Sequence, residues 1–170
     1  MVFIIFSSAQ AEELALGPAN IYLDMIFVPE PYWDAGEPYA DVHYTWNGPL
    51  NCTVYHSKIG HYPYVWIQLH QLEKPTELDL SMIREVVDDS ALLPAGWTKS
   101  ASNLTIAGHK GMMINATSPE GSVVRVVGFS PDGDGGQGRL ICLLRSDLSW
   151  SFTKALLESM RILDSEFASK

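Results

Sequence analysis

The apolar residues of this chain change from alternating to helical spacing twice, and this pattern limits the possible folds more than any other feature. Within residues 64–72, apolar side chains at every second position predict a β-strand with Val65, Ile67 and Leu69 on one face. The spacing then becomes helical, and we expect a helix that Thr76 caps and that ends near residue 89. The apolar side of this helix consists of Leu80, Ile83, Val86 and Val87.

The other apolar runs are short, and turn-forming Pro, Gly and Asn residues separate them. The expected strands are residues 21–28, 39–46, 52–57, 64–72, 103–107, 110–117, 122–130 and 139–146. A last helix follows around residues 152–160, with Asp147 or Ser149 as its N-cap. This order predicts an α+β fold, a single antiparallel β-sheet with packed helices. At 170 residues the chain has the length of one domain, expected to span residues 12–170.

Charged residues are distributed unevenly along the chain. The sequence has 11 Lys and Arg against 20 Asp and Glu, a net charge of −9, whereas a protein that binds nucleic acid needs a basic face. The first 57 residues contain seven acidic residues and no Lys or Arg, and all seven tyrosines lie within the first 64. We therefore expect no nucleic-acid partner. The acidic, aromatic N-terminal third suits a cation or a basic partner, or is a solvated loop.

The N-terminal residues have the form of the end of a secretory signal peptide. A short apolar run at residues 2–6 precedes Ala9-Gln10-Ala11, the small-x-small pattern that signal peptidase cleaves. We interpret residues 1–11 as a signal-peptide remnant, although the positive n-region is missing; a hydrophobic N-terminal strand is the alternative. The interpretation predicts an extracytoplasmic protein, secreted or in the cell envelope. After the N-terminus no apolar run approaches the ~20 residues that cross a bilayer, which excludes a multi-pass membrane protein.

Three N-glycosylation sequons and two cysteines fit an exported protein. The sequons begin at Asn51, Asn103 and Asn115. A disulfide between Cys52 and Cys142 would close a loop of 90 residues and stabilise the fold by roughly 4–5 kcal/mol in the chain-entropy description. Two separate buried thiols are the alternative. The two cysteines lack the CxxC spacing of a zinc or redox site.

The C-terminal half contains a glycine-led hairpin at residues 107–112 and two long strands, before a last helix that ends in Leu157-Glu158-Ser159-Met160. With Gly108, Gly111, Phe129, Trp150 and Ser159 as the matching positions, residues 80–163 resemble PsbP-like domains. The resemblance implies an α/β sandwich. It also implies an accessory role, because the best-known members are extrinsic photosystem II subunits of the thylakoid lumen and related folds bind proteins. It rests on packing positions, so it implies no site residue.

The most unusual local feature is a tandem repeat, Glu-Pro-Tyr-x-Asp, in residues 30–41. Proline restricts each copy, tyrosine offers a flat apolar face, and carboxylates are hard oxygen ligands. We expect this segment to bind a protein partner or a cation, the alternative being a Pro-rich connector without a binding role. The candidate residues are Glu30, Tyr32, Trp33, Asp34, Glu37, Tyr39 and Asp41.

Two further groups are candidate metal ligands. The first begins at Asp132 and is similar to a calcium loop, but Gly136 stands at its fifth position and Leu143 at its twelfth, where a Glu belongs. The second consists of histidines beside the repeat, and no His pair has the HxxxH spacing of a hydrolytic zinc site. The candidates are Asp41, His43, His56, Asp132 and Asp134. We expect no cofactor, with calcium as the alternative.

These observations predict an exported, non-catalytic binding or accessory domain. Its expected partner is a protein, with association at a membrane surface or the cell envelope as a further expectation. The sequence lacks a Gly-x-Ser-x-Gly elbow and a phosphate-binding glycine loop between a strand and a helix. The alternatives are a metal-dependent extracytoplasmic enzyme that uses Asp41, His43 and His56, and a glycosylated structural domain of the cell envelope.

Overall fold

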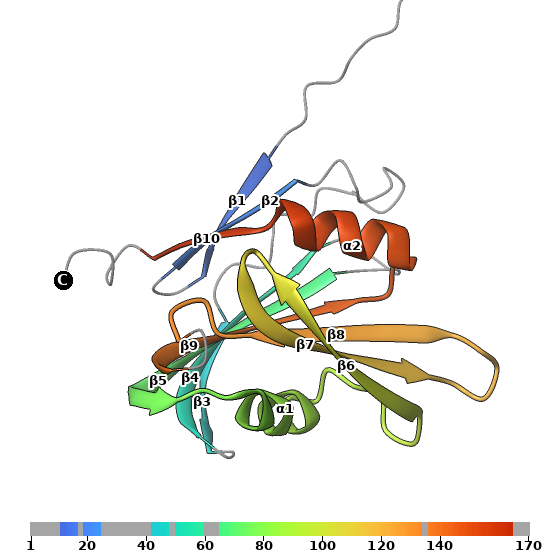
Figure 1. The fold of residues 1–170 in the computed structure, drawn as a ribbon, viewed down its shortest axis with the longest axis horizontal. Coiled ribbons are helices and arrows are strands. Elements are labelled where there is room, and N and C mark those ends of the chain that lie inside the picture. Colours follow the sequence, from blue (N-terminus) through green and yellow to red (C-terminus); the bar gives the residue numbers. More distant parts are fainter. Residues whose placement is uncertain are drawn as a thin grey trace, which may run out of the picture.

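The computed structural model describes residues 11–16, 19–24, 42–47, 50–59, 65–133 and 136–164, which form two antiparallel sheets and two helices (Figure 1). The larger sheet has the strand order β3-β4-β5-β9-β8-β7-β6. Its strands are β3 (Val42–Asn47), β4 (Asn51–Ile59), β5 (Val65–Glu77), β6 (Thr98–Ile106), β7 (His109–Thr117), β8 (Val123–Phe129) and β9 (Gln137–Ser146). The smaller sheet has the order β1-β2-β10, with strands β1 (Ala11–Leu16), β2 (Ala19–Asp24) and β10 (Arg161–Asp164).

The predicted α+β architecture is confirmed, but the expectation of a single sheet is wrong. The second sheet joins the two ends of the described chain, because β1 and β10 both pair with β2. Strands of four and six residues carry too little alternation to be recognised in a sequence, and their pairing depends on contacts between distant segments. Residues 12–16, expected to begin the mature chain, form most of β1.

The two helices cover opposite faces of the seven-stranded sheet (Figure 1). α1 (Leu80–Asp89) packs on β7 and β8, and α2 (Trp150–Ser159) packs on the other side together with the three-stranded sheet. Each face has its own buried cluster. The α2-side cluster includes Leu16, Ile21, Ile67, Phe129 and Leu156, and the α1-side cluster includes Val54, Ile83, Val87, Val126 and Leu143.

Strand β5 and helix α1 follow the sequence prediction closely. Val65, Ile67 and Leu69 all lie in the α2-side cluster, as their alternation predicts. The predicted helix cap is wrong: Thr76 lies in β5, which continues past an irregularity after residue 71. The N-cap is Asp79, whose carboxylate accepts a hydrogen bond from the backbone N–H of residue 82 at 2.8 Å. A hydrogen bond from the Ser81 hydroxyl at 2.7 Å, followed by the one from this backbone N–H, lowers the pKa of Asp79.

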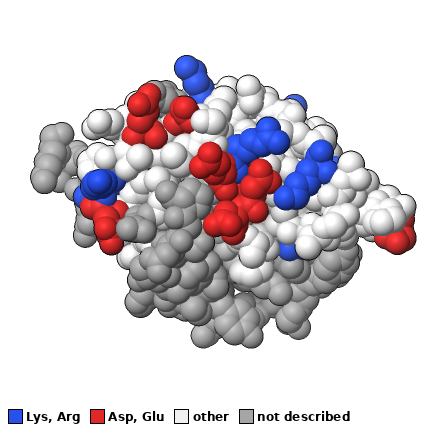
Figure 2. All heavy atoms as spheres, turned by 90° about the horizontal axis from the view of Figure 1, so that it is seen from below, with Lys and Arg blue, Asp and Glu red and all other residues white. Residues whose placement is uncertain are grey.

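The surface on the α1 side is rich in acidic groups. Figure 2 views the molecule from this side and shows Asp and Glu side chains gathered near the centre of the face. Helix α1 contributes exposed Glu85, Asp88 and Asp89, against one basic residue, Arg84. Among the described residues, neither helix is long and apolar enough to span a membrane.

Candidate functional site

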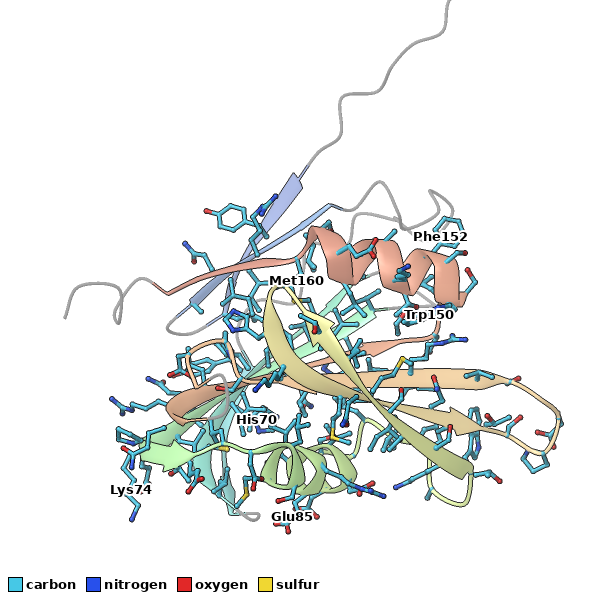
Figure 3. All side chains as sticks on the ribbon, in the orientation of Figure 1. His70, Lys74, Glu85, Trp150, Phe152 and Met160 are labelled. Atoms are coloured by element: carbon cyan, nitrogen blue, oxygen red, sulfur yellow. The ribbon has the colours of Figure 1, made fainter. Side chains whose placement is uncertain are left out.

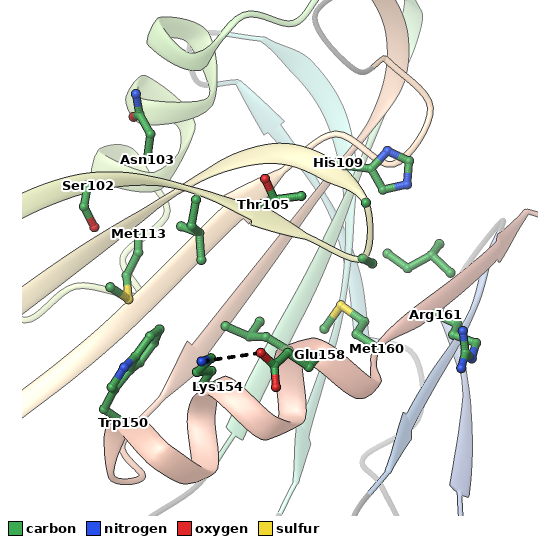
Figure 4. Close-up of a pocket in the computed structure, with 15 residues that line it drawn as sticks. Ser102, Asn103, Thr105, His109, Met113, Trp150, Lys154, Glu158, Met160 and Arg161 are labelled. Carbon is green, nitrogen blue, oxygen red and sulfur yellow. Dashed lines mark ion pairs between the residues drawn. The ribbon is translucent and has the colours of Figure 1, made fainter.

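A cleft of about 840 Å³ separates the β6–β7 hairpin from helix α2 and strand β10. We call it the α2 cleft. Its walls come from residues 102–113 on one side and residues 150–162 on the other. Figure 4 shows the hairpin above the cleft and α2 below it. The cleft exists because the hairpin leaves the plane of the sheet at the end of β6, while α2 stays on the core (Figure 1).

The inner wall of the α2 cleft is apolar. Its residues are Leu104, Met113, Leu157, Met160 and Ile162. Leu157 and Met160 are buried in the α2-side cluster, and the other three are partly buried against the same cluster. The wall is therefore continuous with the hydrophobic core and presents a firm apolar surface to a ligand.

An exposed aromatic side chain stands at one end of the cleft. Trp150 is 40% exposed at the start of α2, and Phe152 beside it is 41% exposed. Both project from the first turn of the helix (Figure 3). Arg125 lies over the Trp150 ring, with its guanidinium carbon 6.0 Å from the ring centroid, and donates a 2.8 Å hydrogen bond to the carbonyl of Leu148. The arginine thus lies within cation–π distance of the indole, which remains 40% exposed.

Strand β6 forms the outer wall and is an edge strand of the seven-stranded sheet. The turn of residues 107–108 that joins it to β7 has positive φ at Ala107 (50°) and Gly108 (89°), the conformation of a type I′ hairpin turn. In a two-residue hairpin the flanking residues, Ile106 and His109, form a hydrogen-bonded pair, and such pairs then alternate along the ladder. The backbone groups that point away from β7 therefore belong to residues 99, 101, 103 and 105. Within the described chain no strand pairs with this side.

Charged side chains occur on the α2 side of the cleft. Lys154 and Glu158 form an ion pair at 3.6 Å, one helical turn apart and both more than half exposed (Figure 4). Arg161 follows at the start of β10 and is exposed. An exposed pair of this kind contributes little to stability, so its charges are available to a ligand.

His109 closes the cleft near the hairpin turn. Its ring stacks on Phe129, with centroids 6.0 Å apart and an interplanar angle of 20°. Its Nδ1 atom is buried and has no hydrogen-bond partner among the described residues. The histidine therefore acts as part of the wall, with its ring packed on the core.

A second polar group lies inside the core on the α1 side of the sheet (Figure 3). His70 Nε2 lies 3.1 Å from Gln68 Oε1, and His70 Nδ1 lies 3.6 Å from Cys52 Sγ. All three side chains are 2% exposed. Burial lowers the pKa of His70 to about 4, so the imidazole is neutral at physiological pH. Because no solvent or ligand reaches this group, we assign it to the core rather than to a site.

The residues predicted to bind a partner lie outside the described part of the chain. They are Glu30, Tyr32, Trp33, Asp34, Glu37, Tyr39 and Asp41, together with the metal candidate Asp134. Their role therefore stays a prediction.

The predicted metal site of Asp41, His43 and His56 includes a residue outside the described part of the chain, Asp41, and so stays a prediction. In the backbone register of β3 and β4, Val42 pairs with His56, and His43 pairs with Tyr55. Among the described residues, no group of three or more His, Cys, Asp or Glu could hold a metal ion.

Asp132 closes the loop between β8 and β9, which explains the residue without calcium. Its carboxylate accepts hydrogen bonds from the backbone N–H groups of Arg139 at 2.7 Å and Leu140 at 3.1 Å. The Ser130 hydroxyl donates to the same carboxylate at 3.1 Å and accepts from the N–H of Gly133 at 2.8 Å. Both carboxylate oxygens are therefore used to join the two ends of the loop.

The two cysteines, for which the sequence left a disulfide open, are free in the structure. Cys52 lies in the α1-side cluster and Cys142 in the α2-side cluster, with β5 between their strands. Their Cβ atoms point to opposite faces of the sheet, and this geometry does not allow a disulfide between them. Burial raises the pKa of Cys52 to about 11 and of Cys142 to about 12, so both thiols stay protonated.

The sequons fall on strands of the large sheet. Asn103 is exposed on β6 and lines the α2 cleft, Asn115 is half-buried on β7, and Asn51 begins β4. Glycosylation at these positions stays a prediction.

Sequence reasoning missed the α2 cleft. Residues 114–149 separate its two walls in the chain, and β6 consists mostly of small polar residues that match no binding motif. The available signal was Trp150, an aromatic residue that the apolar stripe of the last helix does not include. No protein-family model, no curated protein and no solved structure matches this chain, so function has to be argued from the geometry of the cleft.

Proposed function

We propose that this protein is a non-catalytic binding module that takes up an extended peptide segment of a partner protein in the α2 cleft. The peptide would add to the outward side of β6 as a further strand and place side chains against the apolar wall and Trp150. The observation that carries the proposal is an edge strand whose outer side pairs with no other described strand, beside a cleft with an apolar inner wall.

Strand β6 has few of the features that protect edge strands from pairing. It is nine residues long, contains no proline and carries one charge, Lys99. Proteins normally shield such edges with charges, prolines, bulges or short strands, because an open row of N–H and C=O groups pairs with other strands. An edge that stays open next to a cleft is the arrangement used for peptide recognition by strand addition.

The walls of the α2 cleft suit the side chains of an added strand. Leu104 on β6 belongs to the face that packs against the α2-side cluster. Every second residue of an added strand would point to this same face, toward Met113, Leu157 and Trp150. The backbone would then supply affinity, and the apolar wall would select the side chains.

The test replaces Ala101, whose N–H points outward and whose exposed side chain does not line the cleft. Ala101→Pro removes one backbone donor on the open edge while the bonds to β7 remain, because proline is tolerated where the N–H of an edge strand faces solvent. The matched control is Ala101→Thr, which retains the N–H and favours a strand. Peptides selected from a displayed random nonapeptide library on the wild-type protein are titrated against both variants by fluorescence anisotropy.

We expect Ala101→Pro to weaken binding about 10-fold or more, through a lost hydrogen bond and a clash of the ring with the added strand. Ala101→Thr should change it less than about 3-fold. Circular dichroism and the thermal midpoint of each variant check that the hairpin is intact. A library that yields no binding peptide, or peptides that bind the proline and threonine variants equally, would contradict the proposal.

The predictions made from the sequence remain part of this proposal where no finding bears on them. An extracytoplasmic location, a PsbP-like fold and a second docking surface in residues 30–41 are compatible with an accessory peptide-binding domain. The alternative of a metal-dependent enzyme that uses Asp41, His43 and His56 likewise stays a prediction.

A further inference from the structure

The charge around the α2 cleft points to the kind of peptide it takes. Resting on the proposed function, we infer that the cleft selects extended peptide segments that carry carboxylates. The occupant is thus an acidic strand of a partner protein.

The charged residues that line the cleft have a small positive excess in an otherwise acidic protein. They are Lys154 and Arg161 against Glu158, a net charge of +1. Because the whole chain has 11 basic and 20 acidic residues, the rest has 9 and 19, a net charge of −10. Lys99 and Lys110 of the hairpin do not line the cleft, and Lys99 pairs with Asp88 of α1 at 3.1 Å. Such a local reversal of sign attracts an oppositely charged ligand.

Lys154 is the basic residue best placed to meet a ligand carboxylate. It lines the cleft from the middle of α2, between Trp150 and the start of β10, and forms an ion pair with Glu158 at 3.6 Å (Figure 4). Both side chains are more than half exposed, so exchange of the internal carboxylate for one on the peptide costs little. Arg161, at the start of β10 and three residues after Glu158, provides a second positive charge on the same wall.

This preference is opposite to the one that the net charge of the protein predicts. A chain with a charge of −9 repels acidic peptides and attracts basic ones at long range. A measured preference for carboxylates therefore reports the local charge of the cleft and separates it from the field of the whole protein.

The experiment uses three synthetic nonapeptides that alternate Val and Thr and carry two Glu, two Gln or two Lys in place of two Thr. Each is titrated by fluorescence anisotropy against the wild-type chain, Lys154→Gln, Glu158→Gln and Ala101→Pro, at low and at physiological ionic strength. We expect the Glu peptide to bind most tightly. Lys154→Gln should weaken it roughly 2- to 5-fold and Glu158→Gln should tighten it by a similar factor, the range of exposed charge pairs. Salt should weaken it, and the Gln peptide should respond neither to salt nor to the two charge substitutions, whereas Ala101→Pro should weaken both peptides.

Two kinds of failure are distinguishable. The first is a result in which Ala101→Pro still abolishes binding, but the three peptides bind with equal affinity or the Lys peptide binds most tightly. Strand addition then stands, and the inference of acidic selectivity is wrong. If no peptide binds, or Ala101→Pro has no effect, the proposed function itself is wrong. Opposite effects of Lys154→Gln and Glu158→Gln, two positions one helical turn apart, would support the inference.

Discussion

His70 should make the fold sensitive to acid, and the structure allows the size of the effect to be worked out. The imidazole is 2% exposed between Gln68 and Cys52, and burial lowers its pKa from 6.5 to about 4. In the unfolded chain the same group takes up a proton below about pH 6.5. The unfolded state therefore binds more protons than the folded state between these two values, and stability falls as the pH is lowered through this window.

The expected loss follows from the difference of the two pKa values. Linkage gives a destabilisation of about 2 kcal/mol at pH 5 and about 3 kcal/mol at pH 4, relative to neutral pH. Domains of this size are stable by only about 5–15 kcal/mol. Protonation of this one side chain therefore removes a substantial part of the stability, and it does so without any contact with the α2 cleft.

The assay is urea unfolding, followed by tryptophan fluorescence, of the wild-type chain and of His70→Gln at pH 7, 5 and 4. Glutamine is polar and of similar reach but does not titrate in this range, while the other four histidines titrate in both proteins and cancel. His70→Gln should be the less stable protein at pH 7, and the difference should shrink by about 2 kcal/mol at pH 5. A difference between the two proteins that is the same at all three pH values would refute the reasoning.

Three further perturbations test the packing. Gly128→Ala would place a Cβ 2.8 Å from Val87 Cγ2 in α1, so it should destabilise the fold by about 1–3 kcal/mol in urea unfolding; an unchanged midpoint would show that α1 shifts freely. Asp132→Ala removes the acceptor for two backbone N–H groups and should cost about 1–3 kcal/mol, whether or not calcium is present; a midpoint that calcium raises in the wild type alone would restore a calcium site. Without reductant, denatured protein should react with a thiol reagent at both Cys52 and Cys142; a protein without reactive thiols would contradict their placement on opposite faces.

Local sequence patterns predicted those helices and strands whose secondary structure depends on their own residues. The alternation in β5 and the helical spacing of α1 each reflect one buried side, and the structure buries those sides. The three-stranded sheet was missed because it depends on contacts between chain ends, in strands of four and six residues. The cap of α1 was placed three residues early because β5 continues past residue 71 through its pairing with β9, which a local pattern does not reveal.

The candidate site could be predicted less well than the fold, for a physical reason. A motif is visible in a sequence when neighbouring residues carry the chemistry, as in the repeat of residues 30–41. The α2 cleft instead combines backbone groups of one edge strand with side chains from a helix that follows much later in the chain. Backbone hydrogen-bonding groups are the same in every residue, so only the topology shows which of them remain open.

The five residues that carry the PsbP resemblance differ in whether the fold requires them. Gly108 has a φ of 89° in the hairpin turn, and a Cβ on Gly111 would lie 2.6 Å from a β6 side chain. Phe129 is fully buried, and the Ser159 hydroxyl donates to a carbonyl at the end of α2. Packing or hydrogen bonding thus accounts for four of the five positions. Trp150 is 40% exposed and borders the cleft; because folding does not require a large apolar side chain there, we place the anchor for the bound peptide at this residue.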